Sequence, residues 1–153
     1  MNIREANIMD INEIMDLEDQ IFKMHYKARP DWIEKNPRNY EYKKQLIEGN
    51  NGKIFIAEED NKIIGLCIFY IRVISDHHMF FNMVNIEIEN IYVDEKYWKK
   101  GIGKKLFEKV KIYAKENNIN NIELSVWEFN ENAIKFYENM EMKTRIRRME
   151  YKV

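Results

Sequence analysis

The chain has 153 residues, a length that fits a single domain over residues 1–153, because domains usually contain about 100–200 residues. Hydrophobic residues make up 45% of the chain and aromatic residues 13%, which excludes a disordered or low-complexity protein. The 25 Lys and Arg nearly balance the 26 Asp and Glu. This balance is unlike the basic excess of proteins that bind duplex DNA, so we expect no nucleic-acid partner.

Three features predict a cytoplasmic protein without a membrane partner. The one cysteine, Cys67, can form no disulfide within the chain, which fits a reducing compartment. The first 20 residues contain acidic side chains and no apolar stretch, unlike a secretory signal. The longest apolar run, Ile63–Ile71, is interrupted by Gly65 and is much shorter than the ~20 residues of a membrane span.

Apolar spacing divides the first half of the chain into separate elements. In chain order we predict a strand over Ile3–Ala6, a helix over about 10–22, a connection over Lys23–Asn39 and a helix over Tyr40–Glu48. Asp10 and Glu13 form a pair of the capping-box type, which marks the start of the first helix. Turn-forming residues at 49–52 end the second helix. The long connection contains both prolines, and connections of this length are often functional.

The second half begins with strands and then alternates strands with helices. In order we predict strands over Lys53–Glu58, Lys62–Ile74 and about 83–93, a helix from Gly101-Ile102-Gly103 to about Asn117, a strand over Ile122–Val126, a helix from Asn130 to about Met140, and a last strand over Met142–Val153. Three hairpin-type strands followed by this alternation predict an α+β domain with a mixed central sheet flanked by helices.

The strand over 83–93 changes its alternation halfway along. Apolar residues stand at even positions as far as Ile88 and at odd positions from Ile91 to Val93. Side chains alternate between the two faces of a strand, so one face holds both sets only if one residue is inserted. The change predicts a β-bulge near Glu89-Asn90, and bulges often lie beside active sites. The alternative is a strand buried on both faces beyond Asn90.

A glycine-containing loop follows at Tyr97–Lys105. Gly101-Ile102-Gly103 opens a predicted helix, and successive backbone N–H groups at a helix N-terminus favour anion binding. Four nearby lysines add positive charge: Lys99, Lys100, Lys104 and Lys105. The spacing matches neither the Walker A loop nor the dinucleotide-binding fingerprint. The alternative is a tight turn with solvated lysines.

A second motif spans Trp127–Tyr137. Asn130 is a good N-cap for the predicted helix. Tyr137 shares the apolar stripe of that helix with Ile134 and Met140, and a tyrosine in such a position is most often part of the core. Taken alone, this motif therefore favours a structural role.

Together, the bulged strand, the glycine loop and the second motif resemble the GNAT superfamily of N-acetyltransferases, which depend on acetyl-coenzyme A (acetyl-CoA). The signature of that family is a bulged strand, a [QR]xxGx[GA] loop, a helix, a strand and an N..A..FY helix. The matching stretch here is Ile88–Tyr137. Within the family, Ile88–Val93 and Phe129–Tyr137 look similar to spermidine/spermine acetyltransferases, though this narrower likeness is the weaker one. The resemblance implies the GNAT fold with a bulge in its fourth strand.

The resemblance also implies which residues bind acetyl-CoA or CoA. The backbone of Ile91, Tyr92 and Val93 would bind the pantetheine arm at the bulge. The backbone N–H groups that would hold the pyrophosphate belong to Lys99, Lys100, Gly101, Ile102, Gly103 and Lys104. Asn130 would lie near the pantetheine, and Phe136 would pack near the cofactor.

For catalysis, the resemblance implies that Tyr137 is the general acid for the CoA thiolate and that Glu89 is a base acting directly or through water. An alkyl amine with a pKa of about 10.4 is mostly protonated at neutral pH, so something must accept its proton. We expect direct transfer in a ternary complex. The alternative is a covalent route in which Cys67 is acylated, but its mid-strand position in an apolar run favours a buried structural thiol.

The acceptor is expected to be a primary amine: a small amine or polyamine, or a lysine or N-terminal amine of a peptide. This expectation depends on Glu87 and Glu89 meeting the acids at the end of the first helix, Glu18 and Asp19; the alternative is that these carboxylates are solvated. His25 and Tyr26, in the long connection, are candidate acceptor contacts. The three histidines have no metal-ligand spacing with carboxylates, so we expect no metal.

Two departures from the family pattern stand out. Trp98 occupies the usual Arg or Gln position of the loop, and Glu141-Met142 replaces the usual Gly-Phe after the last helix. The rival interpretation is a non-catalytic module that binds CoA or a partner protein. A homodimer is the default that the resemblance implies.

Overall fold

Five strands form one sheet in a computed structural model that describes residues 1–35, 37–49 and 51–153. The strands are β1 (Asn2–Glu5), β2 (Gly52–Glu59), β3 (Lys62–Ile74), β4 (Met83–Val93) and β5 (Asn121–Leu124). The helices are α1 (Ile11–Ala28), α2 (Tyr40–Glu48), α3 (Ile102–Glu116), α4 (Glu131–Asn139) and two short 3-10 turns, η1 (Ile8–Asp10) and η2 (Glu95–Tyr97). No described helix is long and apolar enough to cross a membrane.

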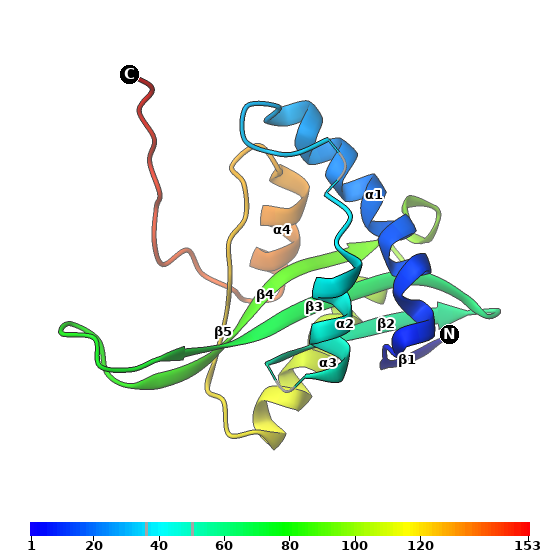
Figure 1. Cartoon of the computed structure of the whole chain (residues 1–153), viewed down its shortest axis with the longest axis horizontal. Coiled ribbons are helices and arrows are strands. Elements are labelled where there is room, and N and C mark those ends of the chain that lie inside the picture. The colour runs from blue at the N-terminus through cyan, green and yellow to red at the C-terminus, as the bar shows by residue number, and fades with distance from the viewer. Residues whose placement is uncertain (36, 50) are drawn as a thin grey trace.

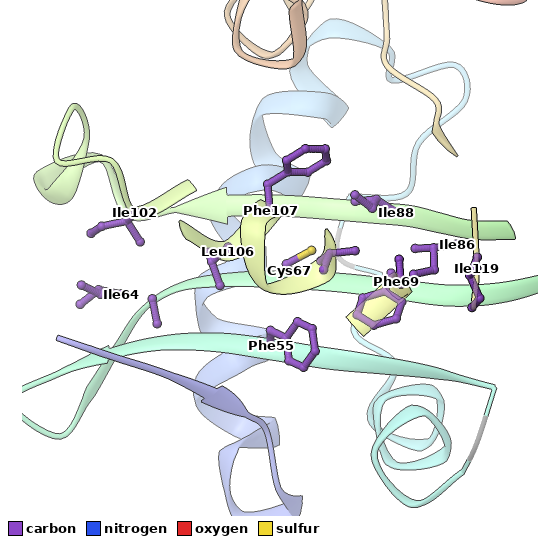
Figure 2. Close-up of a cluster of buried hydrophobic side chains, with 13 residues drawn as sticks. Phe55, Ile64, Cys67, Phe69, Ile86, Ile88, Ile102, Leu106, Phe107 and Ile119 are labelled. Atoms are coloured by element: carbon purple, nitrogen blue, oxygen red, sulfur yellow. The ribbon is translucent and has the colours of Figure 1, made fainter. Parts of the chain in front are cut away.

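The sheet order is β1-β2-β3-β4-β5, antiparallel as far as β4 and parallel between β4 and β5. Helices cover both faces (Figure 1). The core under α1 and α2 contains Leu17, Leu46 and Leu66, whereas α3 packs on the other face. Figure 2 shows Leu106 and Phe107 of α3 lying over that second face. The predicted α+β domain with a mixed, helix-flanked sheet is confirmed.

The predicted bulge is present in β4. Ile68 of β3 pairs with Asn90 and the next residue, Phe69, pairs with Ile88, so Glu89 is the extra residue. The insertion returns Ile91 to the face that Ile88 occupies, and both pack in the core under α3. The bulge predicted from the change in alternation is therefore confirmed. The alternative, a strand buried on both faces beyond Asn90, is not needed.

The first helix is longer than predicted and starts differently. It runs to Ala28, so the connection begins at Arg29. Asp10 stands at the predicted N-cap position of α1, but its side chain makes no cap hydrogen bond there. Asn7 caps the preceding turn η1, because its Oδ1 accepts the Met9 N–H at 2.9 Å. Asp10 instead binds the guanidinium of Arg4, at 2.7 and 2.9 Å. The expected Asp10–Glu13 capping pair is therefore wrong.

The predicted last strand, Met142–Val153, is also wrong. In the part of the chain that the structure describes, this segment pairs with no strand, and Figure 1 shows it leading away from the sheet. Alternation alone cannot make a strand, because a strand needs a neighbour for its ladder of hydrogen bonds. Ion pairs of Glu150 with Arg29 and of Lys152 with Asp31 tether the segment beside the end of α1.

Two smaller predictions also differ in extent. β5 ends at Leu124, two residues before the predicted end of that strand. The predicted turn at 49–52 includes residue 50, which lies outside the described residues; α2 itself ends at Glu48, as expected.

Candidate active site

The loop between β4 and α3 presents a run of free backbone donors. The N–H of Trp98 donates to Glu95 and that of Lys105 donates to Gly101. Between them, the N–H groups from Lys99 to Lys104 donate to no acceptor among the described residues. Lys99 and Gly101 have left-handed φ values of 62° and 75°. Alternation of this kind turns successive N–H groups toward one point, where an anion fits.

The two glycines of the loop have different roles. At Gly101 an added Cβ would meet nothing within 4 Å, so the turn is open toward its free side. At Gly103 a Cβ would lie 3.1 and 3.2 Å from ring atoms of Phe136, so this glycine allows α4 to approach α3 closely. The structure therefore brings Phe136 of the second motif against the glycine loop, although 33 positions separate it from Gly103.

Trp98 ties the loop to the end of β4. Its indole Nε1 donates to the Val93 carbonyl at 2.7 Å. One of the backbone groups expected to face a ligand, the Val93 oxygen, is thus already bonded. The exposed lysines of the loop, Lys99 and Lys100, supply positive charge in place of the Arg or Gln that Trp98 replaces, and the Nζ of Lys100 lies 4.8 Å from the centroid of the Tyr97 ring.

The bulge lies where β4 and β5 separate. Their last paired residues are Ile88 and Leu124, so β4 continues past Glu89 without a neighbour on that side among the described strands. Ile91 packs toward α3, whereas the Tyr92 phenol points to the opposite face and donates to Gln20 Oε1 at 2.7 Å. A strand edge of this kind offers its backbone groups to an extended ligand.

Tyr137 lies on α4 in a largely enclosed position. Its hydroxyl donates to no acceptor in the ranges that the structure describes. Burial, with a smaller effect from the thiol of Cys67, raises the pKa of Tyr137 well above its usual range. The phenol is therefore protonated and able to donate. Asn130 caps the same helix, with its Oδ1 accepting the Ala133 N–H at 3.1 Å.

The four predicted acids come together only in part. Glu18 is buried and pairs with Lys43 at 3.1 Å, and Glu87 pairs with Arg72 at 3.2 Å. Burial raises the pKa of Glu18, with a smaller contribution from the neighbouring charges of Glu89 and Asp19. The carboxylate of Glu18 is therefore close enough to those of Glu89 and Asp19 to feel their charge. The charges of Glu18 and Glu87 are already balanced by Lys43 and Arg72.

Glu89 differs from these acids in its partner. It is exposed, it forms no ion pair within the described ranges, and its Oε2 accepts a hydrogen bond from the Tyr42 phenol at 2.6 Å. A carboxylate held by a neutral donor keeps its negative charge free for a cation.

The predicted acceptor contacts His25 and Tyr26 lie on α1, because this helix extends beyond the expected boundary. The His25 ring meets Phe129 edge-on at 5.8 Å between centroids, and burial lowers the pKa of His25. Tyr26 lines an open cavity of about 510 Å³ with Asp19 and two lysines. Their assignment to the connection was wrong, and their role toward an acceptor stays a prediction.

Two features of the site were missed in the sequence. One is the Tyr42–Glu89 hydrogen bond. The other is an aromatic cluster in which Arg29 lies 5.2 Å from the Trp127 ring, and Trp32 meets Trp127 edge-on at 6.4 Å. The cluster joins the connection after α1 to the segment before α4. Only the abundance of aromatic residues in both segments hinted at it.

Comparison with known proteins agrees with this geometry. The profile of the Acetyltransferase (GNAT) family matches residues 11–142. An uncharacterized N-acetyltransferase of Archaeoglobus fulgidus is 26% identical over 145 residues, which cover 94% of this chain and 93% of that protein. A mutant of the BH1408 protein from Bacillus halodurans superimposes with a TM-score of 0.94 at 26% identity, over 100% of this chain and 99% of the other.

More distant structures share the fold. The aminoglycoside N-acetyltransferase AAC(6')-Iy, solved in complex with CoA, gives a TM-score of 0.75 at 16% identity, over 99% of this chain and 98% of that one. The family match spans most of the chain, including the bulged strand, the glycine loop and Tyr137. The chain therefore belongs to the GNAT family and is an acetyl-CoA-dependent N-acetyltransferase.

Proposed function

We propose that this enzyme moves an acetyl group from acetyl-CoA directly to a primary amine while both substrates are bound. The observation that carries the proposal is the free run of N–H groups from Lys99 to Lys104, in the loop that follows the bulged strand β4. An anion site next to an interrupted strand suits a long phosphorylated thioester.

The loop and the bulge supply the binding groups for CoA in this proposal. The N–H groups of the loop would hold the pyrophosphate, and the backbone of Ile91, Tyr92 and the Val93 N–H would face the pantetheine arm. Phe136 borders the loop from α4, and Asn130, the N-cap of the same helix, would lie near the pantetheine. The free donors, the open turn at Gly101 and the four exposed lysines fit such a ligand. The CoA complex of the aminoglycoside enzyme, which shares the fold, supports this placement.

Glu89 and Tyr137 supply the proton transfers. Bound acetyl-CoA supplies an activated acyl group. Glu89 takes a proton from the incoming ammonium, directly or through water, and this frees the nitrogen lone pair. Tyr137 donates toward the sulfur position, because its hydroxyl is protonated and has no other acceptor in the described part of the protein. Cys67 is fully buried, and burial raises the pKa of its thiol, which disfavours a covalent route through this residue.

The acceptor in this proposal is a cation at neutral pH. Of the four predicted acids, Glu89 is the one that forms no ion pair within the described ranges, whereas Glu18, Asp19 and Glu87 each pair with Lys or Arg. A small amine or polyamine, a lysine side chain and a peptide N-terminus all meet this requirement. Aminoglycosides, the substrates named for two of the structural neighbours, are also polycationic amines and belong in the panel.

The test is release of CoA thiol from acetyl-CoA with this panel of amines. The proposal expects turnover with at least one amine, and a fall of about 10²–10⁴-fold in kcat for Tyr137→Phe or Glu89→Gln, the usual range for general acid–base groups. CoA affinity should change little in either variant. Full activity of Tyr137→Phe would show that the acid is another group. The homodimer and the cytoplasmic location stay predictions; light scattering tests the first.

A further inference from the structure

Among the described residues, the carboxylate on the bulge has one hydrogen-bond partner, a neutral tyrosine. Glu89 Oε2 lies 2.6 Å from the Tyr42 hydroxyl, a short hydrogen bond between residues that are 47 positions apart. The other acids on this face meet Lys or Arg, as Glu18 and Glu87 do. A phenol donor orients a carboxylate without cancelling its charge.

Two further contacts hold Tyr42 in place. Its backbone N–H donates to Asn39 Oδ1 at 2.9 Å at the start of α2. The Nζ of Lys43 lies 5.0 Å from the centroid of the Tyr42 ring. Lys43 is in turn fixed by Glu18 of α1, in an ion pair whose side chains are 5% and 1% exposed. The buried pair therefore locks α2 against α1, which lie side by side over the sheet (Figure 1).

We propose that Tyr42 is a positioning residue for acetyl transfer, whose hydroxyl holds one oxygen of Glu89 so that the other faces the incoming amine. This inference rests on the proposed function. In the step concerned, an N–H bond of the ammonium breaks and an O–H bond forms on the free Glu89 oxygen. The nitrogen keeps its electron pair for the acyl carbon, and Tyr42 keeps its own proton throughout. The protonated Glu89 returns its proton to water after the transfer.

The state of the phenol supports this role. Burial, together with the adjacent carboxylate of Glu89, raises the pKa of Tyr42 well above its usual range. The hydroxyl therefore stays a donor across the pH range of an enzyme assay. Because Tyr42 is half-buried and its hydrogen bond joins α2 to β4, removal of the oxygen alone leaves the packing of the ring in place.

The test is a double-mutant cycle of Tyr42→Phe and Glu89→Gln, with Tyr40→Phe as the matched control. Tyr40 begins the same helix, is exposed, and its hydroxyl makes no hydrogen bond within the described residues. We expect Tyr42→Phe to lower kcat about tenfold or more, because a small displacement of a catalytic group strongly lowers the rate. KM for acetyl-CoA and the thermal midpoint should stay close to those of the parent and of Tyr40→Phe.

In the Glu89→Gln background, Tyr42→Phe should change kcat by less than about twofold, since the two residues act as one unit. A full additional loss in the double variant would show that Tyr42 acts independently of Glu89 and would overturn the inference. Full activity of Tyr42→Phe, or weaker acetyl-CoA binding in place of slower turnover, would overturn it as well. These results leave the proposed function intact, whereas a parent enzyme inactive with every amine refutes both.

Discussion

Replacing Gly101 with alanine tests the left-handed turn from which the CoA loop is built. Gly101 has a φ of 75°, where a residue with a Cβ is less stable by about 1–2 kcal/mol. The added Cβ would meet nothing within 4 Å, so no contact offsets this strain. For a domain of this size, 1 kcal/mol corresponds to about 2–4 °C in Tm. The expected fall in Tm is therefore about 2–8 °C.

The same substitution should weaken CoA binding more than it weakens the fold. The run of free N–H groups from Lys99 to Lys104 passes through this position, and the new methyl group stands on its open side. Loss of one hydrogen bond to a charged group is equivalent to about 1.5–3 kcal/mol. At about 1.4 kcal/mol per factor of ten, Kd should rise about 10–150-fold.

Calorimetric titration with CoA and thermal denaturation measure the two effects separately. Asn118→Ala is the matched control, because Asn118 has a left-handed φ of 56° at the opposite end of α3. It should lower Tm and leave CoA affinity unchanged. Parental CoA affinity in Gly101→Ala would refute the assignment of this loop to the pyrophosphate.

Three further predictions concern the fold around the site. Lys43→Met leaves Glu18 buried without its cation, so unfolding in denaturant should show a loss of about 3–5 kcal/mol, most of it recovered by adding Glu18→Leu; a loss below about 1 kcal/mol would contradict the buried pair. The hydrogen bonds from Arg4 lower the pKa of Asp10, so its stabilisation is present above the ordinary value of 3.8 and is lost on acidification. Asp10→Asn should therefore reduce stability by about 1.5–3 kcal/mol at pH 7 and progressively less below pH 3.8; an equal loss at both pH values would contradict this. Cys67→Ala should keep acetyl transfer within a few fold while lowering stability by about 1 kcal/mol, and an inactive variant would favour the covalent route.

Features set by local geometry could be predicted from the sequence. The bulge at Glu89 follows from the parity change between Ile88 and Ile91, because side chains alternate strictly along a strand. The free N–H groups before α3 follow from the glycine loop at a helix start, since the first turn of any helix has no internal acceptors. The roles of Glu89 and Tyr137 follow from the family resemblance and stay predictions.

The errors have separate physical causes. α1 was predicted too short because its apolar stripe thins after Ile21, although Pro30 marks a better boundary, since the residue before a proline avoids the helical region. The segment after Met142 alternates like a strand but pairs with no strand among the described residues. Whether a pairing strand is available depends on tertiary structure, which the alternation does not report.

The long-range polar contacts could not be predicted from one sequence. Tyr42 meets Glu89 only because α2 packs on the face from which the bulge projects. In the sequence, Lys43 and Glu18 look like solvated surface charges. Both are buried once α1 and α2 pack together. Asp10 binds Arg4 instead of capping α1 for the same reason: this contact forms only when β1 lies beside η1.

Binding of CoA by the loop before α3 is tested most directly by a calorimetric titration of the unmodified protein with CoA and with acetyl-CoA. We expect saturable binding of each at one site per chain, with an affinity that salt reduces because the lysine-rich loop attracts the phosphates. No binding at millimolar CoA would contradict it, and would mean that Trp98 and its bond to the Val93 carbonyl have closed the site.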